Sequence, residues 1–292
     1  MILNATTLST LTTGFKASFQ EGFRTTETYW QRIATMVPSS TKTENYAWLG
    51  QFPRLREWIG DRQVKNLSQS AYTITNRKFE STVAVKRDDI EDDQYGVYSP
   101  LMKEMGFSAA THPDELVFEL LAAGFTTECY DGQYFFDSDH PVGTGVVSNT
   151  GGGSSAPWFL LDVSRALKPL IFQKRREYAL KSFTDANDPN VFMREDYLYG
   201  VDARCNVGFA FWQTAYGAKV TLDATAFNAA LVAMGSLKSD EGKPLGIKPN
   251  LLVVGPTNRA AAKSLIEVDR LANGASNPNY KAVEVLVVPW LT

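Results

Sequence analysis

The stretch YAWLGQFPRLREWIGDRQVKNLSQS, residues 46–70, is the most distinctive part of the chain and decides its fold assignment. Pro53 disfavours a central strand, and the Gly-Asp pair at residues 60–61 marks a turn. Long loops in compact domains are usually functional or disordered, and this one is too aromatic for disorder. Its tryptophans and arginines are Trp48, Trp58, Arg54, Arg56 and Arg62. We therefore expect a loop that buries its aromatic side chains against a neighbouring surface.

Upstream of this loop, residues 8–23 carry an apolar stripe at helical spacing. The opposite face is made of Thr, Ser, Lys and Gln. The stripe consists of Leu8, Leu11, Phe15, Phe19 and Phe23. This pattern predicts an amphipathic helix. We expect it to be an N-terminal arm that lies on another surface, because it cannot form a core alone.

Downstream, residues 97–124 have a helical pattern that we expect to be divided into two pieces. Thr111 is a suitable N-cap for the second piece, with Pro113 and Asp114 in its first turn. Gly124 is a suitable residue to end it.

The other predicted elements mix strands and helices without regular βαβ alternation, which indicates an α+β protein. Residues 72–87 alternate polar and apolar side chains and predict a long strand or hairpin. Residues 131–157 are rich in turn signals and end in GGGSSAP, which predicts a mobile loop. Further strands are expected at 158–163, 169–173, 196–220, 251–254 and 283–288, and helices at 223–237 and 256–267.

The composition is that of an ordinary globular protein: 292 residues, 44% hydrophobic, 21% charged and a net charge of −3. This charge does not indicate a nucleic-acid or anionic-membrane partner for the chain as a whole. No apolar run approaches the roughly 20 residues that span a bilayer, and the start lacks a signal-peptide pattern. Cys129 and Cys205 fit a reducing compartment better than a disulfide scaffold, and they are too few for a thiolate-rich zinc site. The two histidines are His112 and His140.

The acidic run DDIED, residues 88–92, matches a DDxxD metal-diphosphate box. That chemistry needs a second acidic motif and an all-helical cavity, and the sequence indicates neither. We therefore interpret the run as the solvated acidic start of a helix. The alternative is a metal- or diphosphate-dependent enzyme that uses Asp88, Asp89 and Asp92, and it predicts metal binding that Asp→Asn changes abolish.

Ser, Asp and His also occur together in FFDSDHP, residues 135–141. A hydrolase triad needs these side chains to converge from separate elements onto an oxyanion hole. We therefore interpret the segment as a turn whose Asp side chains bond local backbone N–H groups. No GxSxG, GxGxxG or GxxxxGK[ST] motif occurs, and the basic triplet at 174–176 is typical of a solvated edge. The sequence thus predicts no catalytic, metal-binding or cofactor-binding residue.

In several stretches the chain resembles the major head subunit (major capsid protein) family of Mu-like tailed bacteriophages. The segment at 46–62 is specific to that family, whereas the segment at 242–256 recurs across tailed-phage capsid proteins. The matching stretches are YAWLG with FP at 52–53, LREWIGDR at 55–62, FE at 79–80, the FFDSDHP turn, PLIFQKR at 169–175, YGVDARCNVGFAFWQTAYG at 199–217 and GKPLGIKPNLLVVGP at 242–256.

The resemblance implies the tailed-phage major capsid fold of the Hong Kong ninety-seven type. The chain reaches the expected arm directly from Met1, so we expect scaffolding to be a separate protein. Its closing strand is abrupt at Thr292, which leaves open whether the natural chain continues. The implied parts are an N-terminal arm (1–45), a protruding hairpin called the E-loop (46–76), a peripheral domain with a spine helix (77–154), a mainly axial domain (155–255), and the axial domain end with a return to the peripheral domain (256–292).

The resemblance further implies a structural protein and not an enzyme. Pentamers and hexamers of the chain would self-assemble into the icosahedral head shell that encloses phage DNA. The virion capsid would be its location, after assembly in the host bacterial cytoplasm. The implied partners are further copies of the chain, a scaffolding protein, a portal, decoration proteins and double-stranded DNA held by non-specific contact, with no membrane and no cofactor.

Contacts between subunits are expected where aromatic and arginine side chains gather, because these types are enriched at interface centres. Two alternatives remain beside the head shell and the enzyme: an encapsulin-like nanocompartment shell with the same fold, which its cargo would reveal, and a minor phage structural protein such as a tail component. The expected contact residues are Trp48, Phe52, Arg54, Arg56, Trp58 and Arg62 in the E-loop, and Leu8, Leu11, Phe15 and Phe19 in the arm.

Overall fold

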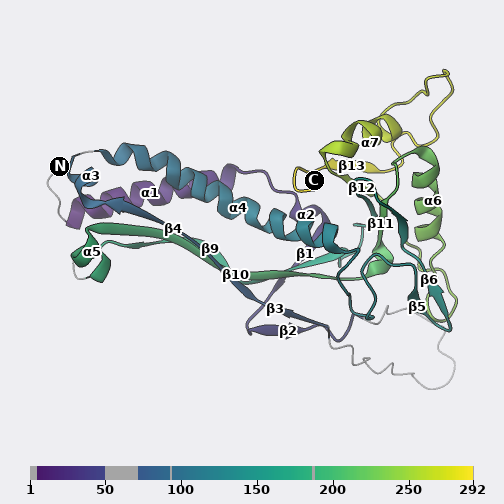
Figure 1. The fold of residues 1–292 in the computed structure, drawn as a ribbon, viewed down its shortest axis with the longest axis horizontal. Coiled ribbons are helices and arrows are strands. Elements are labelled where there is room, and N and C mark those ends of the chain that lie inside the picture. Colours follow the sequence, from purple (N-terminus) through teal and green to yellow (C-terminus); the bar gives the residue numbers. More distant parts are fainter. Residues whose placement is uncertain (1–4, 50–71, 93, 186–187, 292) are drawn as a thin grey trace.

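The computed structural model describes residues 5–49, 72–92, 94–185 and 188–291. Figure 1 shows an elongated part, in which two helices lie along a sheet, joined to a second part built around another sheet. Within these described ranges, no helix combines the length and the apolar character needed to cross a membrane.

The elongated part is built on a four-stranded sheet with the strand order β1-β9-β10-β4. β10 (Asp196–Phe209) is antiparallel to both β9 (Leu170–Phe183) and β4 (Arg77–Lys86), and β1 (Ala34–Pro38) runs parallel to β9. Burial alternates along most of β10, because successive side chains of a strand point to opposite faces. One face is therefore covered, and its buried residues on β10 include Tyr197, Tyr199, Val201, Ala203 and Cys205.

Helices α1 (Ala5–Thr25) and α4 (Tyr98–Ala123) lie side by side over that face (Figure 1). α4 is one continuous helix, so the prediction of two pieces is wrong. Thr111 is not an N-cap, because its hydroxyl donates backwards to the carbonyls of Phe107 and Ser108 within the helix. Pro113 lies inside α4, whereas we expected it in the first turn of a separate second helix.

Asp114 and Gly124 determine where two helices begin or end. Asp114 lies buried on α4, and its carboxylate accepts from the backbone N–H groups of Tyr29 and Trp30, at 2.7 to 3.1 Å. It thereby fixes the start of the short helix α2 (Trp30–Ile33). Gly124 ends α4 as predicted, but with a right-handed φ of −59°. A Cβ there would lie 2.8 Å from the ring of Phe136, so close packing is the reason for glycine.

The second part contains a five-stranded sheet with the order β13-β12-β8-β11-β7. β8 (Trp158–Leu161) and β12 (Leu251–Val254) are buried along their whole length, as their continuous apolar sequences predict. α6 (Ala224–Gly235) begins as predicted, because Asp223 Oδ1 accepts from the N–H of Ala226 at 2.8 Å. The other elements of this part are β7 (Thr150–Gly153), β11 (Ala215–Lys219), β13 (Glu284–Val287), η2 (Trp212–Thr214), η3 (Pro256–Asn258) and α7 (Arg259–Ile266).

The sheet pairings correct the expected division of the chain. β9 and β10 lie in the elongated sheet beside β4, although 155–255 was expected to be mainly a separate domain. The closing strand β13 pairs with β12 in the second sheet, so it does not return to the first. Residues 131–157 contain the hairpin of β5 (His140–Val142) and β6 (Gly145–Val147) as well as β7, where a mobile loop was expected. Local periodicity predicts strands, but it does not identify their distant partners.

Candidate interaction surface

A small two-stranded ribbon projects from the elongated sheet on the side opposite the helices (Figure 1). It consists of β2 (Thr43–Asn45) and β3 (Thr73–Thr75), which are antiparallel. The hydroxyls of Thr43 and Thr75 face each other across the strands at 3.0 Å. The ribbon is the base of the expected E-loop, and beside it the N–H of Tyr46 donates to the carbonyl of Tyr72 at 2.8 Å.

Buried polar contacts fix this base to the body of the same chain. Tyr46 donates its hydroxyl to Gln173 Oε1 at 2.8 Å, and Gln173 Nε2 donates to the carbonyl of Ile74 at 3.1 Å. Burial raises the pKa of Tyr46 to about 12, so its phenol remains a neutral donor at physiological pH. On the other arm of the ribbon, the hydroxyl of Tyr72 accepts from the N–H of Phe209 at 2.7 Å.

Apolar packing reinforces the same anchor. Leu49 is fully buried and Ile74 nearly so, in a cluster with Ile171 and Phe211. At Gly208 on β10, a Cβ would lie 2.3 Å from the side chain of Ile74, so the ribbon seats directly on the strand backbone. Residues 46–49 and 72–75 are therefore held in a fixed position on the body of the chain.

One expected contact residue stands at the point where the described hairpin ends. Trp48 is 40% exposed, although Leu49 and the nearby rings of Tyr46 and Phe211 are buried. Its ring lies 6.3 Å from that of Phe211, edge to face, which holds it in place with much of its surface free. The remaining expected E-loop residues lie outside the described residues: Phe52, Arg54, Arg56, Trp58 and Arg62.

The N-terminal stripe is a different case, and its prediction is wrong. Phe15 and Phe19 are 2% and 0% exposed, and Leu11 is buried with them in a cluster formed with α4 and β10 of the same chain. Leu8 packs against the edge of that cluster. The ring of Phe15 meets Tyr199 edge to face at 5.0 Å. The helical pattern correctly showed that this face is buried, but the covering surface belongs to its own chain.

Two glycines explain how closely α1 approaches α4. A Cβ at Gly22 of α1 would lie 2.1 Å from the carbonyl oxygen of Lys103. A Cβ at Gly106 of α4 would lie 2.1 Å from the carbonyl oxygen of Phe19. Because neither glycine has a side chain, the backbones of α1 and α4 come into direct contact, and the two helices pack closely.

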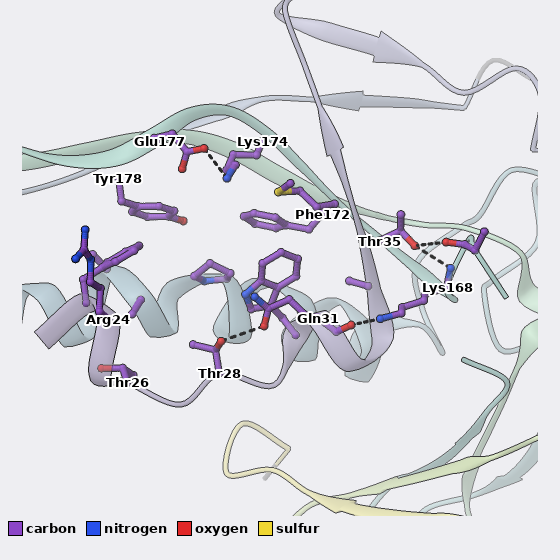
Figure 2. A pocket seen from close by; sticks show the side chains of 18 residues that line it. Arg24, Thr26, Thr28, Gln31, Thr35, Lys168, Phe172, Lys174, Glu177 and Tyr178 are labelled. Atoms are coloured by element: carbon purple, nitrogen blue, oxygen red, sulfur yellow. Dashed lines mark hydrogen bonds and ion pairs between the residues drawn. The ribbon is translucent and has the colours of Figure 1, made fainter. Parts of the chain in front are cut away.

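A hollow of about 700 Å³ opens where α1 ends, between α2, α4, β1 and β9 (Figure 2). Aromatic rings of Trp30, Phe172 and Tyr178 line it, and the first two lie 4.7 Å apart. The ammonium of Lys168 donates to the carbonyl of Gln31. Partial burial, with a smaller contribution from the nearby charge of Arg32, lowers the pKa of this lysine.

This hollow does not resemble a catalytic site. The ammonium of Lys174 lies 2.6 Å from Glu177 Oε1, so its charge is already paired (Figure 2). Among the described residues that line the hollow there is no histidine, cysteine, serine or aspartate. It is a surface depression with an aromatic floor and basic groups.

The acidic run at 88–92 and the FFDSDHP segment, which contain residue types found in active sites, have structural roles. The acidic run begins α3 (Arg87–Glu91) as predicted, and Arg87 pairs with Glu91 at 2.8 Å. It is followed by the short helix η1 (Gln94–Val97), and α5 (Pro189–Arg194) lies near the same tip of the molecule (Figure 1). In FFDSDHP, Asp137 accepts from the N–H groups of Ser138 and Tyr134, which confirms the predicted turn.

A long helix on a four-stranded sheet, a projecting two-stranded ribbon and a second sheet at one end define a class of protein: the shell subunit of the tailed-phage capsid fold, Hong Kong ninety-seven type. Within that class, the chain belongs to the family described as Mu-like prophage major head subunit gpT, whose model matches residues 8–291.

Individual relatives agree with this assignment. The chain is 47% identical to the Mu-like prophage FluMu major head subunit of Haemophilus influenzae over 266 residues, covering 87% of this chain and 86% of the relative. It is 41% identical to the major capsid protein of Escherichia phage Mu, with both chains covered completely. The solved procapsid of bacteriophage JBD30 contains a chain with 50% identity and a TM-score of 0.88, covering 99% of this chain and 100% of that one.

These findings confirm the resemblance seen in the sequence and the fold that it implied. The chain is a major capsid protein of the Mu-like head shell, from a structural family and not an enzyme family. The diphosphate-dependent enzyme, the nanocompartment shell and the tail component are therefore set aside.

Proposed function

We propose that copies of this chain form pentamers and hexamers in a closed icosahedral head, and that the hairpin at 46–76 carries the main contact to an adjacent copy. One observation carries the proposal: both ends of the hairpin are fixed in the chain's own core, while Trp48 is left 40% exposed at the point of departure. A base that is already ordered reduces the loop-ordering cost of a contact.

The composition of the hairpin supports an interface. Tryptophan and arginine dominate the energetic centres of protein–protein contacts, and the segment contains Trp48 and Trp58 together with three arginines. Each contact can be modest, because closure of a symmetric shell makes every subunit bind several others at once. The shell thus gains stability from repetition.

The remaining parts of the proposal concern partners and place. Assembly occurs in the host bacterial cytoplasm, with a separate scaffolding protein, a portal and decoration proteins, and the finished shell encloses double-stranded DNA. The net charge of −3 supports a container that holds DNA by non-specific contact, since tight binding calls for a strongly basic surface.

The test is the variant Trp58→Ala, compared with Trp48→Ala and with the core variant Leu49→Ala. We expect both tryptophan variants to keep the circular dichroism and thermal stability of the wild-type subunit, because Trp48 is 40% exposed and the proposal places Trp58 against an adjacent copy. Electron microscopy should then show that shells are lost or reduced. Leu49→Ala should instead lower thermal stability, since Leu49 is fully buried. Wild-type yields of shells from Trp58→Ala contradict the proposal.

A further inference from the structure

Three side chains of metal-ligand type meet in the segment that joins α4 to β7. Cys129, Asp131 and His140 each present one possible ligand atom, and these atoms lie within 4.8 Å of one another. His140 Nδ1 is 2.8 Å from Asp131 Oδ2, and Cys129 Sγ is 3.1 Å from Asp131 Oδ1. The sequence did not indicate this group, because turns separate His140, at the start of β5, from Cys129 and Asp131.

A residue outside the group determines which nitrogen of His140 carries a proton. The amide of Asn149 has a fixed orientation, because its Nδ2 donates to the carbonyl of Phe135 at 2.7 Å and its Oδ1 accepts from the N–H of Asp137 at 2.9 Å. The same Oδ1 lies 3.2 Å from His140 Nε2. Two acceptors cannot bond each other, so Nε2 carries hydrogen and donates to Asn149.

In the neutral imidazole this leaves the lone pair of Nδ1 directed at the carboxylate of Asp131. Two acceptors that face each other at 2.8 Å in a buried place repel, so a cation must lie between them. An imidazole that donates one N–H to a fixed carbonyl oxygen and offers the other nitrogen is also the usual arrangement of a metal-binding histidine. The cation is either a proton or a metal ion.

We propose that Cys129, Asp131 and His140 bind one zinc ion through Sγ, a carboxylate oxygen and Nδ1. The ligand set suits zinc, which accepts thiolate, imidazole and carboxylate together. A thiolate and a carboxylate neutralise the two charges of the ion, so the loaded site carries no net charge where burial is nearly complete. Water takes the fourth position, on the side where the Asp131 side chain keeps 10% exposure.

The ligand atoms must move apart for zinc to bind. Zinc–ligand distances of about 2.0–2.3 Å place tetrahedral ligand atoms roughly 3.3–3.6 Å apart, whereas Asp131 lies 2.8 Å from His140 Nδ1 and 3.1 Å from Cys129 Sγ before the ion binds. Burial raises the pKa of the Cys129 thiol, with a further contribution from Asp131, so the thiol is protonated before the ion arrives. Binding therefore releases that proton to solvent as the zinc–sulfur bond forms.

The position of the site gives the ion a structural role. The ring of His140 stacks on Trp212 at 4.0 Å with an interplanar angle of 10°. Trp212 belongs to η2, where the chain passes from the long strand β10 into the second sheet. A zinc ion on His140 thus ties the end of α4 to the joint between the two parts of the subunit.

The test uses the full-length subunit, treated with chelator, supplied with one equivalent of zinc and dialysed. Elemental analysis should give one zinc ion per wild-type subunit, and cobalt in place of zinc should give a thiolate-to-cobalt charge-transfer band. Cys129→Ser should lose the band and the stoichiometric zinc. The matched control Cys205→Ser, at a buried cysteine beside Tyr178, should keep both.

Two results overturn the proposal. Wild-type subunit without stoichiometric zinc shows that a proton alone bridges His140 and Asp131. Equal zinc binding by Cys129→Ser places the ion elsewhere. Circular dichroism checks that the Cys129→Ser variant is folded. If the variant does not fold, the cobalt spectrum of the wild-type subunit decides. Bound cobalt without a thiolate band excludes Cys129 as a ligand and therefore excludes this site.

Discussion

At the scale of single residues, buried polar groups fix how the helices are joined. Asp114 accepts two backbone N–H groups at the start of α2 from a position on α4, and its side chain is almost fully buried. Burial raises the pKa of this carboxyl, while the hydrogen bonds from Trp30 and Tyr29 lower it. Desolvation thus disfavours the charged carboxylate, and the hydrogen bonds from the two N–H donors offset part of that cost.

Replacement of this carboxylate should be costly. In Asp114→Ala, the buried N–H of Trp30 and the part-buried N–H of Tyr29 lose their acceptor. The buried donor alone costs about 1–3 kcal/mol, so we expect a loss of at least about that size in the free energy of unfolding. Asp114→Asn keeps one acceptor oxygen and should lose less. Urea unfolding of the subunit measures both. Equal stability of Asp114→Ala and the wild type would show that these bonds do not hold α2.

Asp114 also shows that contacts between residues distant in the sequence could not be predicted from the sequence. The start of α6 near Asp223 was predicted, and its cap is local, because donor and acceptor are three residues apart. The cap of α2 was not predicted, because its acceptor lies 84 residues from its donor Trp30. His140 was predicted to lie in a turn, but it begins the strand β5. Its burial against Trp212 depends on the folded joint and has no local signal.

At the scale of elements, the N-terminal helix is part of the core. The stripe on α1 had the spacing of a helix with one buried face, and this much was predicted. Amphipathic spacing does not reveal which surface covers the face, and here it is α4 and β10 of the same chain. Strand structure at 72–87 was predicted more fully, because alternation and β-branched residues are local properties. The segment forms β3 and β4, which lie in different sheets, so it is not a hairpin.

Glycine substitutions test the seating of α1 on α4. Gly106→Ala should lower the melting temperature of the subunit, because the new methyl group meets the carbonyl oxygen of Phe19 and forces the helices apart. The matched control is Gly14→Ala on α1, where nothing lies within 4 Å of the added group. That change should raise stability by about 0.5–1 kcal/mol, since alanine favours a helix interior. Similar effects of the two substitutions would argue against close packing.

At the scale of the whole molecule, we expect the shell to be held without covalent cross-links. Some capsids of this fold join subunits through a Lys–Asn isopeptide bond, which requires near-attack geometry that chance neighbours rarely provide. Lys65 and Asn66 would be the local candidates, but no motif around them identifies a partner, and both lie outside the described residues. Mature particles boiled in denaturing detergent should give a single band at the mass of the monomer. A ladder of multimers that resists reductant would contradict this expectation.

The central claim is that the chain tiles a closed shell through a hairpin that reaches an adjacent copy. Its most direct test is an electron cryomicroscopy reconstruction of the head particle in which residues 50–71 are traced. We predict an icosahedral shell of pentamers and hexamers, with the segment leaving the Tyr46–Tyr72 base and its Trp58 buried against a neighbouring subunit. A trace in which the segment folds back onto its own subunit, with Trp58 in its own core, would contradict the account.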